Sequence, residues 1–129
     1  MNKKQPVFLD LTKIKLPPMA IVSIMHRLSG ILLFVLLPVM MYFFGLSIDS
    51  PLSFLTLQQD LQHPFTFFVV WAFCGAFLFH VLSGLRHLVM DFGFGETRQH
   101  GHQSALGVFV VFILLFVVFT VWLMLKVGS

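Results

Sequence analysis

Two groups of polar side chains interrupt long apolar stretches of this 129-residue chain. The first group contains Ser23, His26, Arg27 and Ser29, followed by Gly30, and the spacing of four places Ser23 and Arg27 on one face of a helix. Arginine offers a planar fork of hydrogen-bond donors that suits carboxylate or ketone oxygens. Two interpretations stay open for this group. It binds a ligand, or Arg27 snorkels to phospholipid headgroups while Ser23 bonds a neighbouring helix.

The second group lies between residues 80 and 91 and contains His80, Ser83, Gly84, Arg86, His87 and Asp91. His80 and His87 are two helical turns apart on one face, about 10 Å along the axis, and Gly84 between them leaves room for a flat group. An imidazole at membrane depth bonds another helix, relays protons or ligates a metal. The pattern favours haem, with His80 as the ligand of the iron. The cationic partners of the propionates would be His26, Arg27, Arg86 and His87.

Charge is scarce and unevenly placed along the chain. Hydrophobic residues make up 58% of the sequence and charged residues 10%, against about 25% charged in ordinary soluble domains. Only Asp49 and Asp60 carry charge between residues 28 and 85, and residues 104–125 carry none. This pattern excludes a soluble globular enzyme, a disordered chain and a nucleic-acid-binding protein. The single cysteine, Cys74, excludes an internal disulfide and a zinc ribbon.

We expect an all-α membrane protein that forms a single domain over residues 1–129. Apolar stretches long enough to span a membrane predict helices at about 19–46, 64–90 and 104–126. Turn and cap residues predict loops over 47–63 and 91–103, and Pro38 should kink the first helix. This helix is too long, and carries too many polar groups, for a cleaved signal peptide.

The distribution of basic residues predicts the orientation of the helices. The tail of residues 1–18 carries four lysines, the 91–103 segment carries Arg98, and the 47–63 segment has no lysine or arginine. The N-terminus and the second loop should therefore face the cytoplasm, and the C-terminus the outside. Trp71 and Trp122 would be interfacial anchors at the outer ends of their helices. Three helices form a thin bundle whose polar residues must face protein, so we expect a membrane partner.

Both polar groups carry a recognisable pattern. Residues 23–30, Ser-Ile-Met-His-Arg-Leu-Ser-Gly, resemble the S-x-x-H-R-x-[S/T]-G signature of the cytochrome b membrane-anchor subunits of succinate dehydrogenase (Complex II). Residues 80–93 are similar to the second signature of that family, H-x-x-x-G-[L/I]-R-H-x-x-x-D-x-G. The segment 6–11 also fits, although Gln5 stands where the family usually has arginine. The resemblance covers essentially the whole chain.

The resemblance implies roles for individual residues. His80 would be one axial ligand of haem b, and a second membrane-anchor subunit would supply the other. Ser23 and Arg27 would contact ubiquinone. His26 and His87 would lie near the haem propionates. Arg27 would contact both the haem and the quinone. The implied function is to pass electrons from succinate, through a flavoprotein subunit and an iron–sulfur subunit, to ubiquinone in the bacterial inner membrane. Without a flavin or iron–sulfur motif, the chain is not expected to be an enzyme by itself.

Two other functions stay open. The first is the anchor of a fumarate reductase-type quinol enzyme, which runs the same chemistry in the opposite direction. The second is a small proton-relay or structural membrane protein in which His80 and His87 form the relay. The identity of the quinone distinguishes the first alternative, and a colourless, haem-free preparation would support the second.

Overall fold

The computed structural model describes residues 15–129 of the chain. Within this range the backbone forms the helices α1 (Pro18–Asp49), α2 (Pro51–Asp60), α3 (Pro64–Asp91) and α4 (Arg98–Val127), without any strand. The three long helices are all long and apolar enough to cross a membrane. The predicted all-α membrane architecture is therefore confirmed. The lysines at positions 3, 4 and 13 and the 6–11 segment lie outside the described residues.

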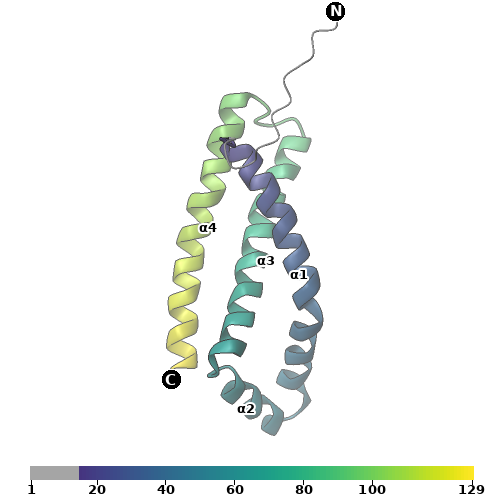
Figure 1. Cartoon of the computed structure of the whole chain (residues 1–129), viewed down its shortest axis with the longest axis vertical. Helices are drawn as coiled ribbons and strands as arrows, with labels where there is room; N and C mark the ends of the chain where they lie inside the picture. Colours follow the sequence, from purple (N-terminus) through teal and green to yellow (C-terminus); the bar gives the residue numbers. More distant parts are fainter. Residues whose placement is uncertain (1–14) are drawn as a thin grey trace, which may run out of the picture.

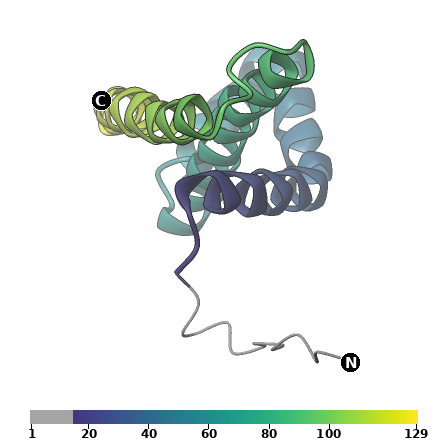
Figure 2. The same ribbon diagram turned by 90° about the horizontal axis from the view of Figure 1, so that it is seen from above.

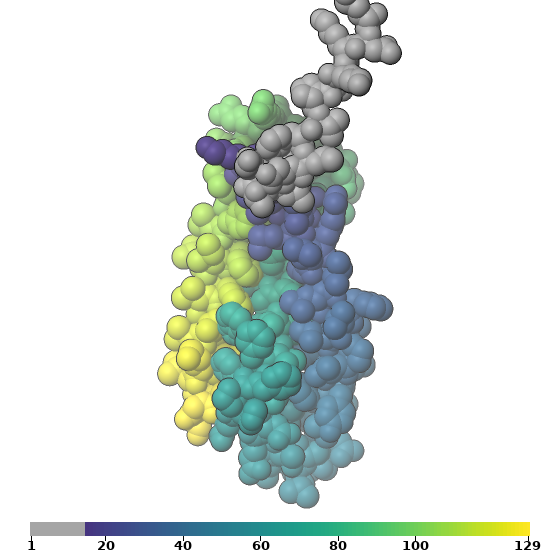
Figure 3. Space-filling view, in the orientation of Figure 1, coloured from purple at the N-terminus to yellow at the C-terminus, as the bar shows by residue number. Residues whose placement is uncertain are grey.

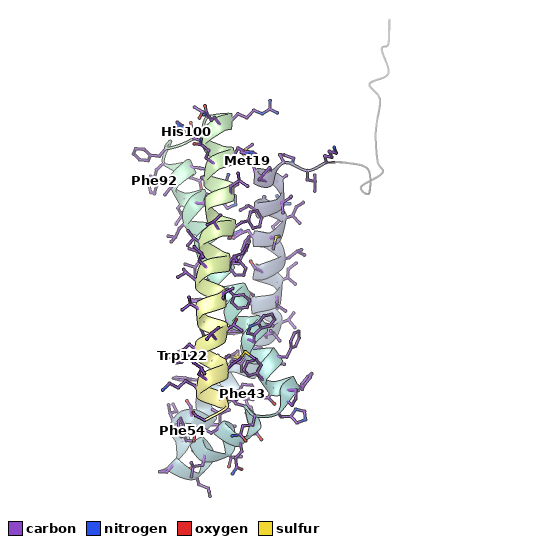
Figure 4. All side chains as sticks on the ribbon, turned by 90° about the vertical axis from the view of Figure 1, so that its left-hand side faces the viewer. Met19, Phe43, Phe54, Phe92, His100 and Trp122 are labelled. Carbon is purple, nitrogen blue, oxygen red and sulfur yellow. The ribbon has the colours of Figure 1, made fainter. Side chains whose placement is uncertain are left out.

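The three long helices run side by side along the molecule (Figure 1), with α3 antiparallel to both α1 and α4. Seen from above, α1 and α4 lie on different sides of α3 (Figure 2), and each makes most of its contacts with α3. The start of α1, the end of α3 and the start of α4 therefore meet at one end of the bundle. Met19, Phe92 and His100 lie at this end, whereas Phe54 and Trp122 lie toward the other (Figure 4).

Local signals explain where the helices begin. The helices α1, α2 and α3 each have proline in the first turn, where a missing N–H costs nothing. The predicted loop over 47–63 is wrong in its middle, because Ser50 caps α2 in a reciprocal capping box with Ser53. The predicted loop over 91–103 is also too long. The Thr97 hydroxyl accepts from the His100 N–H, so α4 begins at Arg98.

The buried core lies toward the end of the bundle where α1, α3 and α4 meet. Val22 of α1 and Ala105 of α4 are fully buried, and Phe79 of α3 packs between them with Val108. Most other large apolar side chains of the long helices are exposed. Such a surface suits contact with lipid or with other membrane helices, because neither environment penalises apolar side chains.

Toward the other end, aromatic side chains join α3 to α4. The indole N–H of Trp71 donates to the Thr120 hydroxyl at 3.0 Å, and the Phe116 ring lies 4.9 Å from the Trp71 ring and 5.2 Å from that of Phe112. Trp71 thus joins α3 to α4. Its predicted role as an interfacial anchor does not include this contact. Gly75 makes this packing possible, since a Cβ there would lie 2.7 Å from Cζ of Phe116.

We predict that Gly75→Ala destabilises the packing of α3 on α4. The Phe116 ring cannot move aside freely because it is held between two other aromatic rings, and overpacking of this kind costs about 1–3 kcal/mol. Thermal unfolding of the detergent-purified assembly that contains the chain measures the effect. The matched control is Gly45→Ala, because no atom lies within 4 Å of a Cβ built at Gly45. That change should leave stability equal or slightly higher, and equal destabilisation by both changes would contradict the packing argument.

Candidate functional site

Three histidine rings from α1 and α3 gather near the shared end of the bundle. The His26 ring from α1 stacks on the His80 ring from α3, with centroids 4.2 Å apart and planes 11° from parallel. The His26 ring also lies 5.2 Å from the His87 ring, tilted by 56°. The three side chains are all half-buried. The structure therefore brings together the histidines of the two polar groups.

The Nδ1 atom of His80 reaches across to the backbone and a hydroxyl group of α1. It lies 3.2 Å from the carbonyl oxygen of His26 and 3.1 Å from Oγ of Ser29. A carbonyl oxygen only accepts hydrogen bonds, so this geometry places the proton of a neutral ring on Nδ1. The Nε2 atom is then left with its lone pair, which is the form in which imidazole binds a metal.

Two glycines allow α1 and α3 to approach at this point. A Cβ at Gly30 would lie 3.1 Å from Cε1 of His80, which is tighter than ordinary contact. A Cβ at Gly84 would lie 3.4 Å from Nε2 of His26. Each glycine therefore faces the imidazole that the opposite helix contributes. A larger residue at Gly30 would press against the His80 ring, whereas a Cβ at Gly84 would make an ordinary contact with the His26 ring.

Ser23 and Arg27 lie on α1 beside the histidines. Ser23 is half-buried, whereas Arg27 is exposed at the surface of the described chain. The exposed guanidinium leaves Arg27 available to a ligand, a lipid headgroup or another subunit. The structure thus places the two residues on the expected helix, one turn apart.

Arg86 faces away from the histidines, toward α4. It is only 8% exposed, and its Nε atom donates to Ser104 Oγ at 2.9 Å while Nη2 donates to the Gly101 carbonyl at 3.1 Å. Gly101 is itself buried, and a Cβ there would lie 2.6 Å from Sδ of Met19. Arg86 therefore ties the end of α3 to the start of α4. Its predicted contact with a haem propionate stays a prediction.

Sequence reasoning missed the roles of Ser29 and Ser104. Ser29 belongs to the first motif, but its distance from His80 depends on how α1 and α3 pack. Ser104 and Gly101 are one turn apart at the start of an apolar helix, a weak signal for an arginine partner. Among residues 15–129, no three His, Cys, Asp or Glu side chains are placed to hold a metal ion.

Comparison with known proteins places the chain in a family. The family model for the succinate dehydrogenase/fumarate reductase transmembrane subunit matches residues 1–120. The chain belongs to this family. It is 47% identical over 124 residues to the succinate dehydrogenase cytochrome b556 subunit of Coxiella burnetii, covering 95% of this chain and 99% of that one. It is 29% identical over 122 residues to the subunit of the same name from Paracoccus denitrificans, covering 92% and 94%.

Family membership confirms the resemblance inferred from the two motifs. The chain is a multi-pass membrane subunit of the succinate dehydrogenase type, and subunits of this kind work with the other subunits of Complex II. The histidine cluster, Arg27 and Arg86 lie in the part of the chain that the family match covers.

We predict that Arg86→Met loosens the start of α4. The change removes two hydrogen bonds from a charged donor, and such bonds are each worth about 1.5–3 kcal/mol. The purified complex should therefore unfold at a lower temperature. Arg98→Met is the matched control, because Arg98 is exposed and begins α4. If both arginine changes lowered the unfolding temperature equally, the contacts of Arg86 with α4 would not explain its burial.

Proposed function

We propose that this chain binds haem b and ubiquinone as a membrane anchor of bacterial succinate dehydrogenase. In this role it passes electrons from the iron–sulfur subunit to ubiquinone. The observation that carries the proposal is the setting of His80, whose Nδ1 lies 3.2 Å from the His26 carbonyl. This setting leaves Nε2 free to bind iron at membrane depth. The names of the two relatives, both cytochrome b556 subunits, support the same function.

The residues around His80 fit a haem group. A haem needs an imidazole with a free Nε2 in apolar surroundings, and cationic or polar groups for its propionates. Gly30 and Gly84 keep bulky side chains away from the rings on the two facing helices. His26 and His87 stand beside His80 toward the shared end of the bundle, where propionates would reach them. The second axial ligand would come from a second membrane-anchor subunit.

Arg86 is the propionate candidate that this structure constrains most. A guanidinium has five N–H donors, and two of the nitrogens already donate to Ser104 and Gly101. We therefore assign Arg86 first to the α3–α4 contact, where it also supplies positive charge to this end of the bundle. Its remaining N–H groups are those it could offer to a propionate.

When bound, the haem supplies a one-electron carrier beside the quinone site. The work of the chain is to place ubiquinone and to stabilise charge on its oxygens. Arg27 would donate to a quinone oxygen through its exposed guanidinium, and the Ser23 hydroxyl, one turn away, would donate a second hydrogen bond. Donors fixed in advance stabilise the negative charge that develops on these oxygens during reduction.

The proposed orientation brings this site to the cytoplasmic face of the inner membrane. The basic residues Lys15 and Arg98 lie at the end of the bundle that carries the site. At the other end, the C-terminal half of α4 has one basic residue, Lys126. The end of a membrane protein that has more lysine and arginine residues tends to face the cytoplasm. The iron–sulfur subunit, and behind it the flavoprotein subunit, would then dock over Arg27. The exposed apolar faces of the long helices would contact lipid and the second anchor subunit.

A fumarate reductase anchor is the alternative, because the family description covers both enzymes. Both relatives are succinate dehydrogenase subunits, which favours ubiquinone reduction. Extraction of the quinone from the native membrane tests the choice, since menaquinone alone would favour the alternative.

We predict that His80→Ala removes the haem b signal from the purified complex. The reduced-minus-oxidised spectrum measures it, because loss of an axial imidazole abolishes the low-spin absorption. His102→Ala is the matched control, since His102 is exposed on α4 and lies outside the three-histidine cluster. An unaltered low-spin spectrum after His80→Ala would show that another residue ligates the iron.

We predict that Arg27→Ala slows ubiquinone reduction at least tenfold and leaves succinate oxidation by a soluble dye unchanged. The dye accepts electrons before the quinone site, so its rate reports the flavoprotein and iron–sulfur subunits alone. In well-studied oxyanion holes, the loss of one hydrogen-bond donor lowers the reaction rate about 10²–10³-fold. Arg98→Ala serves as the control at the same end of the bundle. Equal loss of both activities would indicate an assembly defect.

A further inference from the structure

We infer that Ser29 is a positioning residue for the haem ligand: its hydroxyl holds the His80 ring in orientation and makes it a stronger electron donor to iron. The inference rests on the proposed role of His80. Ser29 lies on α1 and His80 on α3, so this contact also joins two helices at the site. None of the ligand roles expected from the sequence includes Ser29.

The contact is made within the protein, and the serine that makes it is buried. Ser29 is 8% exposed. Its Oγ lies 2.7 Å from the carbonyl oxygen of His26, one turn earlier on α1, and 3.1 Å from Nδ1 of His80. The same Nδ1 lies 3.2 Å from the His26 carbonyl. Three polar atoms therefore form a closed triangle, in which each atom is within hydrogen-bond distance of the other two.

Counting protons gives one arrangement for this triangle. The His26 carbonyl oxygen has no proton and accepts from both neighbours. The Ser29 hydroxyl donates its single proton to that carbonyl, and the Nδ1–H of His80 points between the carbonyl and the Ser29 oxygen. In the opposite tautomer the lone pair of Nδ1 would face the lone pairs of the His26 carbonyl oxygen, and the 3.2 Å between these two atoms would make the contact repulsive. Ser29 therefore contributes a second acceptor to the Nδ1–H.

The surroundings of the Ser29 hydroxyl are apolar, which increases the cost of losing a hydrogen bond there. Ser29 also lines an apolar groove of about 330 Å³ between α1, α3 and α4, together with Leu28, Leu32, Phe79 and Phe112. Side chains of α3 are visible between α1 and α4 in the space-filling view (Figure 3). In such surroundings a polar group without a protein partner is costly, so the Ser29 hydroxyl and the Nδ1–H of His80 keep their bonds within the triangle that they form with the His26 carbonyl.

The expected consequence concerns the balance between the two oxidation states of the haem. Acceptors on the outer N–H of a ligating histidine fix its orientation and raise its basicity. A more basic imidazole stabilises ferric iron more than ferrous iron. Removal of the Ser29 hydroxyl should therefore raise the reduction potential of the haem and weaken its retention.

The test compares Ser29→Ala, Ser29→Thr and Ser83→Ala in the purified complex. Ser83 is the control, because it is fully buried on α3 and its hydroxyl bonds backbone carbonyls of its own helix, that of Phe79 at 2.6 Å and that of His80 at 3.3 Å, and not the His80 ring. The midpoint potential of the haem, from a redox titration followed by absorbance, is the main readout. The haem content per complex is the second.

For Ser29→Ala we expect up to a tenfold greater loss of affinity for ferric than for ferrous haem, which corresponds to a potential about 59 mV more positive for a one-electron couple. Ser29→Thr keeps the hydroxyl and should restore the original potential. Ser83→Ala should leave it unchanged. If Ser29→Ala prevents assembly, Ser29→Cys, a weaker acceptor of similar size, should give a smaller shift in the same direction.

The inference is overturned if Ser29→Ala (or Ser29→Cys, where the alanine variant does not assemble) leaves the potential unchanged. It is also overturned if Ser83→Ala shifts the potential equally, or if Ser29→Thr behaves like Ser29→Ala. His80→Ala separates this failure from that of the proposed function. Loss of haem in His80→Ala with no effect at Ser29 defeats only the role of Ser29, whereas retention of haem in His80→Ala defeats the assignment of the ligand itself.

Discussion

The close approach of α1 and α3 at Gly30 is the contact on which the rest of the site depends. A Cβ at Gly30 would lie 3.1 Å from Cε1 of His80, so any other residue would push the imidazole or its helix away by a few tenths of an ångström. The hydrogen bonds of His80 Nδ1 are already 3.1 and 3.2 Å long, and a further displacement would weaken them. The absence of one side chain on α1 therefore determines whether the imidazole is held in one orientation.

The membrane explains why these polar groups bond so completely to one another. Apolar surroundings offer no water to replace a missing partner, and an unpaired polar group there costs several kcal/mol. In the described part of the chain, every buried side-chain nitrogen or oxygen has a hydrogen-bond partner. Ser83 bonds its own helix, and Arg86 bonds α4. Some of these bonds, such as that of Arg86, also join one helix to the next.

Sequence patterns predicted the features that are determined within a single helix. The three spans follow from apolar length, and the shared face of Ser23 and Arg27 follows from their spacing of four. The patterns could not give the relative rotation of two helices, which decides that Arg86 points to Ser104 while His80 points to Ser29. They also missed α2, because its ten residues are too short for a periodic signal and its capping box was interpreted as a turn.

The two arginines of the motifs show how burial separates residues that the sequence treats alike. Both lie at the same end of the bundle beside histidines, but Arg86 is only 8% exposed and bonded to α4, whereas Arg27 is exposed. An exposed arginine on a spanning helix is costly in lipid unless a partner covers it. Under the proposed function His80 would also need a partner, because the second ligand of the haem iron would come from the second anchor subunit. In the proposed function, Arg27 and His80 would therefore each form half of a contact, and the iron–sulfur subunit and the second anchor subunit would supply the other halves.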